Sequence, residues 1–172
     1  PTSKTTAELS KEFGVPLTDF TKVQELDLAI DGADEVDDNL QLIKGGGGAL
    51  FREKVVADAA KEFLVIVDES KKVKHLGKFP LPVEVVPFGL EVTINKVSNF
   101  GCEVVLRKTP EGIYVTDNGN YILDCYFEQI LDPKALHNDL ISLVGVVETG
   151  LFIDMTTKVL IGKPSGVEVI EK

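Results

Sequence analysis

The sequence predicts an α/β fold in which a parallel sheet carries a smaller α+β unit. Two wholly apolar runs, at residues 28–30 and 63–67, are each followed directly by charged residues. A helical pattern separates them, and a strand, a helix and a strand in that order form a right-handed unit with parallel strands. From Pro80 onward, several prolines and short strand patterns indicate an antiparallel α+β arrangement instead.

Polar residues gather where the first apolar run ends. Asp31 and Asp34 follow it at once, then Lys44 and four consecutive glycines, 45–48. A continuous apolar run is typical of a strand with both faces buried, and open α/β sheets bind ligands at the carboxyl ends of such strands. Glycines before a helix let backbone N–H groups approach an anionic ligand. A flexible glycine linker beside a solvated acidic loop is the alternative interpretation.

The helix after the glycines carries the sharpest candidate, Glu53. If the helix begins near residue 49, its apolar face holds Ala49, Glu53, Val56 and Ala60, and its polar face holds Lys54, Asp58 and Lys61. A glutamate on an apolar stripe is costly unless it is paired. Burial there raises its pKa toward the range of a general base. The alternatives are a different helix phase, or a structural pair with a basic neighbour.

Composition excludes several classes of function. The net charge of −10 over 172 residues argues against a nucleic-acid partner. No apolar run reaches the length of a membrane span, and no signal peptide is visible. The two cysteines, Cys102 and Cys125, lie in strand-like stretches, which favours buried, reduced thiols. We therefore expect an intracellular, cytoplasmic protein, or a plastid protein if a transit peptide has been removed. Nothing has metal-ligand spacing, so no metal is expected.

The remaining elements of the first part are a helix and two strands. Thr5 and Glu8 form a capping box for a helix that ends near Phe13, with Gly14 as its stop. The threonines and serine of this segment could instead contact a phosphate. Strands follow at 26–30 and 63–67, and after the second strand Lys71 can reach the same sheet edge as Asp31. A solvated charged turn is the alternative for Lys71.

The second part reads as a strand, a helix, three strands, a helix and a strand. The patterns place strands at 83–86, 102–107, 113–116, 121–126 and 146–153, and helices at 90–100 and 133–143. Asp132 and Pro133 are typical of a helix start, and an Asn-Gly pair at 118–119 predicts a tight turn. This order predicts one sheet with both helices on one face. It shows no convergent polar set, so we expect scaffold or subunit contact. A final strand at 158–161 and a turn at 162–166 plausibly return to the first sheet.

Five motifs resemble type A ribose-5-phosphate isomerase in the same order over nearly the whole chain. They are DGADE (31–35), KGGGGALFREK (44–54), DESKKV (68–73), GKFPLPVEVVP (77–87) and VTDNGNYILD (115–124). The resemblance implies interconversion of ribose 5-phosphate and ribulose 5-phosphate in the pentose phosphate pathway without a metal or organic cofactor. It also implies a Rossmann-like domain carrying a smaller, ferredoxin-like α+β domain. We expect the first at residues 1–79 and 154–172, and the second at 80–153.

The resemblance also implies roles for individual residues. Glu53 matches the catalytic base, and the substrate-binding positions are Asp31, Gly32, Ala33, Asp34, Lys44, Gly45, Gly46, Gly47 and Lys71. One carboxylate can carry a proton between C1 and C2 through an enediolate, and Lys44 with the glycine N–H groups could stabilise the enediolate oxygen. The substrate is then a small sugar phosphate, and the family implies a homodimer or homotetramer.

The family pattern includes an upstream strand with a GTGST-type phosphate loop, which this sequence does not contain. We therefore expect the chain to be part of a longer protein, with an incomplete phosphate site. An inactive fragment and a non-catalytic sugar-phosphate-binding domain are the alternatives that follow. A relative of the acyl-CoA transferases is a third interpretation, but the lysine and four-glycine segment suits a small anionic sugar better than CoA.

Overall fold

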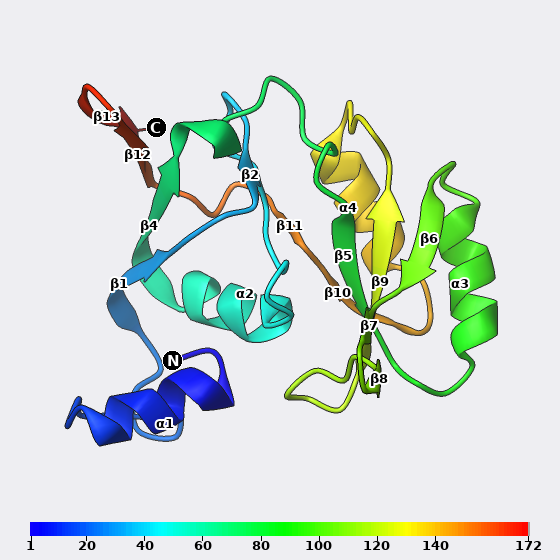
Figure 1. Ribbon diagram of the computed structural model, residues 1–172, viewed down its shortest axis with the longest axis horizontal. Helices are drawn as coiled ribbons and strands as arrows, with labels where there is room; N and C mark the ends of the chain where they lie inside the picture. Colours follow the sequence, from blue (N-terminus) through cyan, green and yellow to red (C-terminus); the bar gives the residue numbers. More distant parts are fainter. Residues whose placement is uncertain (172) are drawn as a thin grey trace.

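A computed structural model describes residues 1–171 of the chain. Figure 1 shows two parts side by side, with α2 beside β1 and β4 in one and α3 and α4 beside the second sheet. The helices are α1 (Lys4–Glu12), α2 (Leu50–Asp58), α3 (Leu90–Ser98), α4 (Pro133–Ile141) and the short 3₁₀ helix η1 (Glu69–Lys71). The strands are β1 (Leu26–Asp31), β2 (Glu35–Val36), β3 (Leu42–Ile43), β4 (Ala60–Asp68), β5 (Leu81–Val85), β6 (Glu103–Leu106), β7 (Lys108–Thr109), β8 (Gly112–Ile113), β9 (Tyr121–Tyr126), β10 (Val146–Thr149), β11 (Leu151–Phe152), β12 (Lys158–Lys163) and β13 (Gly166–Glu171).

The first sheet has the strand order β1-β4-β12-β13. β1 and β12 both pair with β4 in parallel, and β13 pairs with β12 antiparallel. The predicted strand–helix–strand unit and the return of the final strand to this sheet are therefore confirmed. α2 packs on one face, where Phe63, Val65, Phe152, Val159 and Ile161 form a buried core with it. The sheet brings the carboxyl ends of β1 and β4 to the same edge.

The opposite face of this sheet is open to solvent within residues 1–171. Leu28, Ile30, Ile66 and Val169 are 46%, 57%, 50% and 50% exposed. The expectation that the apolar runs are buried on both faces is therefore wrong for the described residues. Alternate residues of a strand point to opposite faces, so only one set of each run enters the core.

The second sheet is antiparallel, with the order β10-β5-β9-β6. Val83 and Val85 of β5 share one buried cluster with Val97 of α3 and Leu140 of α4. Both helices therefore pack on the same face, as the element order predicts. Most buried apolar residues among residues 1–171 form two clusters. Ile43 and Leu76 of the first predicted part belong to the second cluster, and Phe152 of the second part belongs to the first. The domain boundaries themselves stay a prediction.

Two predicted strands are wrong in extent. The strand expected at 113–116 is reduced to β8, which pairs only with β7, because the chain from Thr116 to Asn120 folds into a loop against buried Glu84. The strand expected at 146–153 is two strands in two sheets: β10 pairs with β5, whereas β11 pairs with β3. Gly150 separates them, and a Cβ there would clash with the Lys44 carbonyl oxygen.

The helix ends lie within three residues of the predictions. Ser3, not Thr5, is the N-cap of α1, since its side chain accepts a hydrogen bond from the Thr6 amide. Gly14 follows α1 with a positive φ of 68°, as expected for a helix stop. Asp132 caps α4 as predicted, accepting from the Ala135 amide. α2 ends at Asp58, so Ala60 belongs to β4 and not to the helix face that was expected to hold it.

Candidate active site

One open hollow of about 270 Å³ lies at the carboxyl end of β1. Its lining residues are Asp31, Gly32, Ala33, Asp34, Lys44, Gly45, Gly46, Gly47, Glu53 and Lys71. These are the ten residues for which the family resemblance implies a role as base or substrate contact. They come from the end of β1, the turn before β2, the segment after β3, α2 and η1. The fold thus brings together side chains that are up to forty residues apart, because β1 and β4 are parallel neighbours.

Lys44 is the centre of this hollow, and its ammonium group is buried. Its Nζ lies 3.1 Å from an Asp31 carboxylate oxygen and 3.3 Å from Glu53 Oε2. It also donates a hydrogen bond to the Gly32 carbonyl. The Lys44 amide is fixed separately, by donation to the Gly150 carbonyl at 2.9 Å. A positive charge is therefore held in one place between two carboxylates.

Glu53 is the most perturbed acid of the hollow. Its side chain is 15% exposed, and burial raises its pKa above the ordinary value for glutamate. The positive charge of Lys44 opposes this rise, and the negative charges of Asp31 and Asp34 add to it. Among the described residues Glu53 Oε2 has no hydrogen-bond partner of good geometry, despite the nearby ammonium. This oxygen is buried beside the Lys44 ammonium.

The glycine loop is tied to the acidic loop. The Gly46 amide donates a hydrogen bond of 2.8 Å to the Asp34 carboxylate. A Cβ at Gly46 would come within 2.7 Å of that same carboxylate, so the close approach requires glycine. Gly45 and Gly48 have φ values of 103° and 83°, which side-chain-bearing residues rarely adopt. The four glycines are therefore a shaped loop and not a flexible linker.

Two charged neighbours of Glu53 hold α2 in place. Arg52 reaches the Asn118 side chain at 2.9 Å and the Asp117 carbonyl at 3.0 Å. Lys54, expected on the polar face of the helix, is largely buried and donates to Glu148 and to the carbonyls of Thr149 and Leu151. β10 and β11 cover that side of the helix, which helical periodicity alone does not reveal.

The second part of the chain contacts the glycine loop beside the hollow, contrary to the expectation that it holds no convergent polar set. Arg107 donates to the carbonyls of Gly45 and Gly46, at 2.9 and 3.1 Å. Asp124 binds the same guanidinium through both carboxylate oxygens. The only sequence signal for this pair is a lone arginine at the end of an apolar strand, which does not show where its side chain points.

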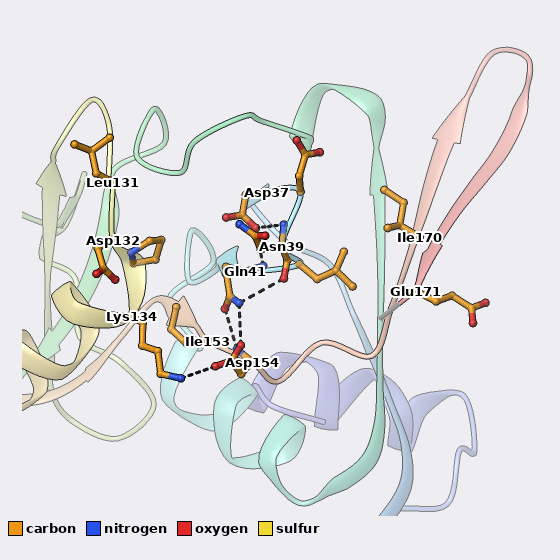
Figure 2. Close-up of a pocket in the computed structure, with 13 residues that line it drawn as sticks. Asp37, Asn39, Gln41, Leu131, Asp132, Lys134, Ile153, Asp154, Ile170 and Glu171 are labelled. Carbon is orange, nitrogen blue, oxygen red and sulfur yellow. Dashed lines mark hydrogen bonds and ion pairs between the residues drawn. The ribbon is translucent and has the colours of Figure 1, made fainter.

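A larger hollow of about 590 Å³ lies elsewhere, between the 37–41 turn, the start of α4 and the end of β13 (Figure 2). None of the ten predicted site residues lines it. Its polar groups bind one another: Asp37 accepts from the amides of Asn39 and Gln41, and Asp154 pairs with Lys134 and Gln41. The smaller hollow is the one that holds the buried carboxylate of Glu53, whose pKa is raised by burial.

The described residues hold neither a metal-binding cluster nor a membrane-spanning helix. Within residues 1–171, no group of three or more histidine, cysteine, aspartate or glutamate side chains is arranged to hold a metal ion. Across the same residues, no helix is both long and apolar enough to cross a membrane. Cys102 and Cys125 are free and buried, as the strand-like context predicts.

Comparisons with known proteins agree on one family. The family model described as ribose 5-phosphate isomerase A (phosphoriboisomerase A) matches residues 1–166. Ribose-5-phosphate isomerase A 1 of Oceanobacillus iheyensis is 56% identical over 169 residues, which are 98% of this chain and 75% of that protein. The structure of ribose 5-phosphate isomerase A from Methanocaldococcus jannaschii is 43% identical with a TM-score of 0.94, covering 100% of this chain and 77% of that one. A D-ribose-5-phosphate isomerase in complex with phospho-erythronic acid is 40% identical with a TM-score of 0.96, covering 100% of this chain and 76% of that one.

Proposed function

Because this chain belongs to the ribose 5-phosphate isomerase A family, we propose that it interconverts ribose 5-phosphate and ribulose 5-phosphate with Glu53 as the base. The observation that carries the assignment of the base is the position of Glu53. It is a buried carboxylate with a raised pKa, 3.3 Å from a buried ammonium, in a hollow at a sheet edge. The pentose phosphate pathway is the metabolic setting that this reaction implies.

The reaction needs one base that serves two carbons. In the open-chain aldose, the Glu53 carboxylate takes the proton from C2, and the electron pair forms the C1–C2 double bond of the enediolate. The carbonyl oxygen on C1 gains negative charge in this step, and Lys44 lies where it can stabilise that charge. Glu53 then returns the proton to C1, and the proton of the C2 hydroxyl is transferred to the C1 oxygen, so that C1 carries a hydroxyl and C2 becomes the ketone carbon. A raised pKa suits this exchange, because the base must both accept and release the proton near neutral pH.

The other residues of the hollow would bind the sugar. Asp31 and Asp34 offer carboxylate oxygens to hydroxyl groups, and one of them would assist ring opening. Gly45, Gly46 and Gly47 contribute backbone N–H groups, and Gly32 and Ala33 line the opposite loop. Lys71 of η1 adds a positive charge at the rim, which favours a phosphorylated substrate over a neutral sugar.

The test is formation of ribulose 5-phosphate from ribose 5-phosphate by this chain, measured with and without EDTA. We expect turnover that survives EDTA and falls at least about 100-fold in kcat in Glu53→Gln, because general-base catalysis contributes that much or more. Glu62→Gln is the matched control, since Glu62 is an exposed glutamate on β4. Normal turnover in Glu53→Gln would refute the base assignment.

The alternative is a non-catalytic sugar-phosphate-binding chain or an inactive fragment of the isomerase. It predicts binding of ribose 5-phosphate by calorimetry with no turnover in the wild-type chain. A homodimer or homotetramer, implied by the family, is the assembly we propose, and sedimentation velocity measures it. The proposed partners otherwise remain the small-molecule substrate, with no nucleic acid, and the cytoplasmic location stays a prediction.

A further inference from the structure

The second part of the chain holds the glycine loop by its carbonyl groups. Arg107 Nη1 donates to the Gly45 and Gly46 carbonyls, at 2.9 and 3.1 Å. The Tyr114 hydroxyl donates to the Gly47 carbonyl at 3.3 Å. Three successive peptide groups of the loop therefore have their oxygens turned toward side chains of the second part.

The guanidinium that makes these contacts is itself fixed. Asp124 accepts from both Nε and Nη2 of Arg107, and the two side chains are each 14% exposed. The Arg107 guanidinium carbon also lies 5.8 Å from the centre of the Tyr114 ring. A bidentate pair with a carboxylate and contact with an aromatic ring leave the arginine little freedom, so it is a rigid anchor for the loop.

Holding a carbonyl also orients the amide on the other side of the same peptide bond. In a planar trans peptide, the C=O of one residue and the N–H of the next point in opposite directions. The Gly46 amide donates to Asp34 and the Gly48 amide donates to the Gly45 carbonyl. Among the described residues the Gly47 amide has no partner. Gly47 lines the hollow, and a Cβ on it would meet nothing within 4 Å.

We propose that Arg107 is a positioning residue that holds the Gly47 N–H toward the enediolate oxygen through the Gly46 carbonyl. Tyr114 supports it by fixing the next peptide group of the loop, whose Gly48 N–H donates to the Gly45 carbonyl. The inference rests on the proposed isomerase function and adds residues of the second part to that reaction. Neither side chain lines the hollow, so each acts through the loop and not by touching substrate. The Gly47 amide then stabilises charge that develops in the transition state, which affects kcat more than substrate binding.

The kinetic test compares three variants under saturating and limiting ribose 5-phosphate. We expect Arg107→Met to lower kcat about 100-fold with KM changed less than about threefold, because a misplaced donor costs this much. Arg107→Lys keeps a cation but not the forked geometry, so it should recover only part of the loss. Tyr114→Phe keeps the ring and removes one donor, and should lower kcat by roughly threefold to tenfold. Lys134→Met is the control, since it removes the ion pair with Asp154, away from the loop.

A second measurement does not depend on turnover. Amide hydrogen exchange by NMR should show faster exchange at Gly46 and Gly48 in Arg107→Met, with the strands of both sheets unchanged. Unchanged exchange in the loop, or a kcat within threefold of the wild type, would overturn the positioning role. Absence of turnover in the wild-type chain would instead refute the isomerase proposal, and the exchange result would still decide whether Arg107 holds the loop.

Discussion

At the scale of the residue, the environment of Glu53 decides what the site can do. Burial raises its pKa, and the neighbouring Lys44 charge limits that rise. In the proposed mechanism the base is active only as the carboxylate, so the pKa of Glu53 would determine where activity is lost as the pH falls. In that mechanism Lys44 would have two effects from one position: it would stabilise charge on the substrate, and its positive charge lowers the pKa of Glu53.

The pH profile tests this account of Glu53. The acid limb of kcat/KM should lie at a higher pH than an ordinary glutamate would give, because the pKa of the group is raised. Lys44→Met removes the positive charge that lowers the pKa of Glu53. The acid limb of the pH profile, measured on the residual activity, should therefore move to still higher pH. A limb that stays in place or moves to lower pH would contradict the role of Lys44. Lys78→Met, a change outside the hollow, serves as the control.

At the scale of the element, α2 is fixed by the two residues that flank the base. Arg52 binds the 117–118 turn, and Lys54 binds Glu148 and two carbonyls at the junction of β10 and β11. The Lys54 side chain is 12% exposed, and burial lowers its pKa while Glu148 opposes the shift. Three consecutive charged residues therefore divide their roles: the outer two attach the helix to the second part, and the middle one faces the hollow.

Removing the Lys54 charge should destabilise the fold. Lys54→Met leaves Glu148 buried without its partner, which costs about 3–5 kcal/mol in the free energy of unfolding, as for other broken buried pairs. Urea denaturation followed by circular dichroism measures it. Lys61→Met is the matched control, because Lys61 is 56% exposed and its ion pairs with Glu25 and Asp27 lie on the surface. Equal unfolding midpoints for the two variants would show that the Lys54 contacts do not anchor the helix.

At the scale of the whole molecule, the first sheet has one packed face and one open face. Val65 of β4 is fully buried, whereas the next residue, Ile66, is 50% exposed. The two are similar in size and adjacent in sequence, so only the face of the sheet distinguishes them. The described chain therefore presents an apolar surface formed by Leu28, Ile30, Ile66 and Val169.

Paired substitutions on β4 test the two faces. Val65→Thr places an unpaired hydroxyl in the core and should lower the free energy of unfolding by about 1–3 kcal/mol. Ile66→Thr should change it by less than about 0.5 kcal/mol, because half of that side chain already meets water. Ile66→Thr should also reduce the fluorescence of a hydrophobic dye bound to the folded chain, and Val65→Thr should not. The reverse order of the two stability effects would mean that the open face is covered in solution.

Local sequence patterns were sufficient to predict much of the fold and the convergence of polar side chains at the hollow. The apolar runs, the acidic residues after the first run and the glycine segment predicted that Asp31, Asp34, Lys44, Glu53 and Lys71 converge at one sheet edge. These residues line one hollow there, because parallel neighbouring strands end together. Their roles in the reaction stay a proposal. The prediction of one strand at 146–153 was wrong, because a single apolar pattern continues through Gly150 although its two halves pair in different sheets. The prediction of a strand at 113–116 was wrong in extent, because Thr116 folds toward Glu84. Local sequence pattern does not encode that contact.

The sequence by itself determined the parallel strand–helix–strand unit, the family resemblance and the choice of Glu53, since periodicity and motif spacing are local properties of the chain. Only the tertiary structure decided that Lys54 is buried, that one face of the first sheet is open, and that Arg107 reaches the glycine loop from about 60 residues away in sequence. The physical reason is that packing between distant segments sets burial and side-chain partners. Neither the period of a helix nor that of a strand specifies which distant segment will cover it.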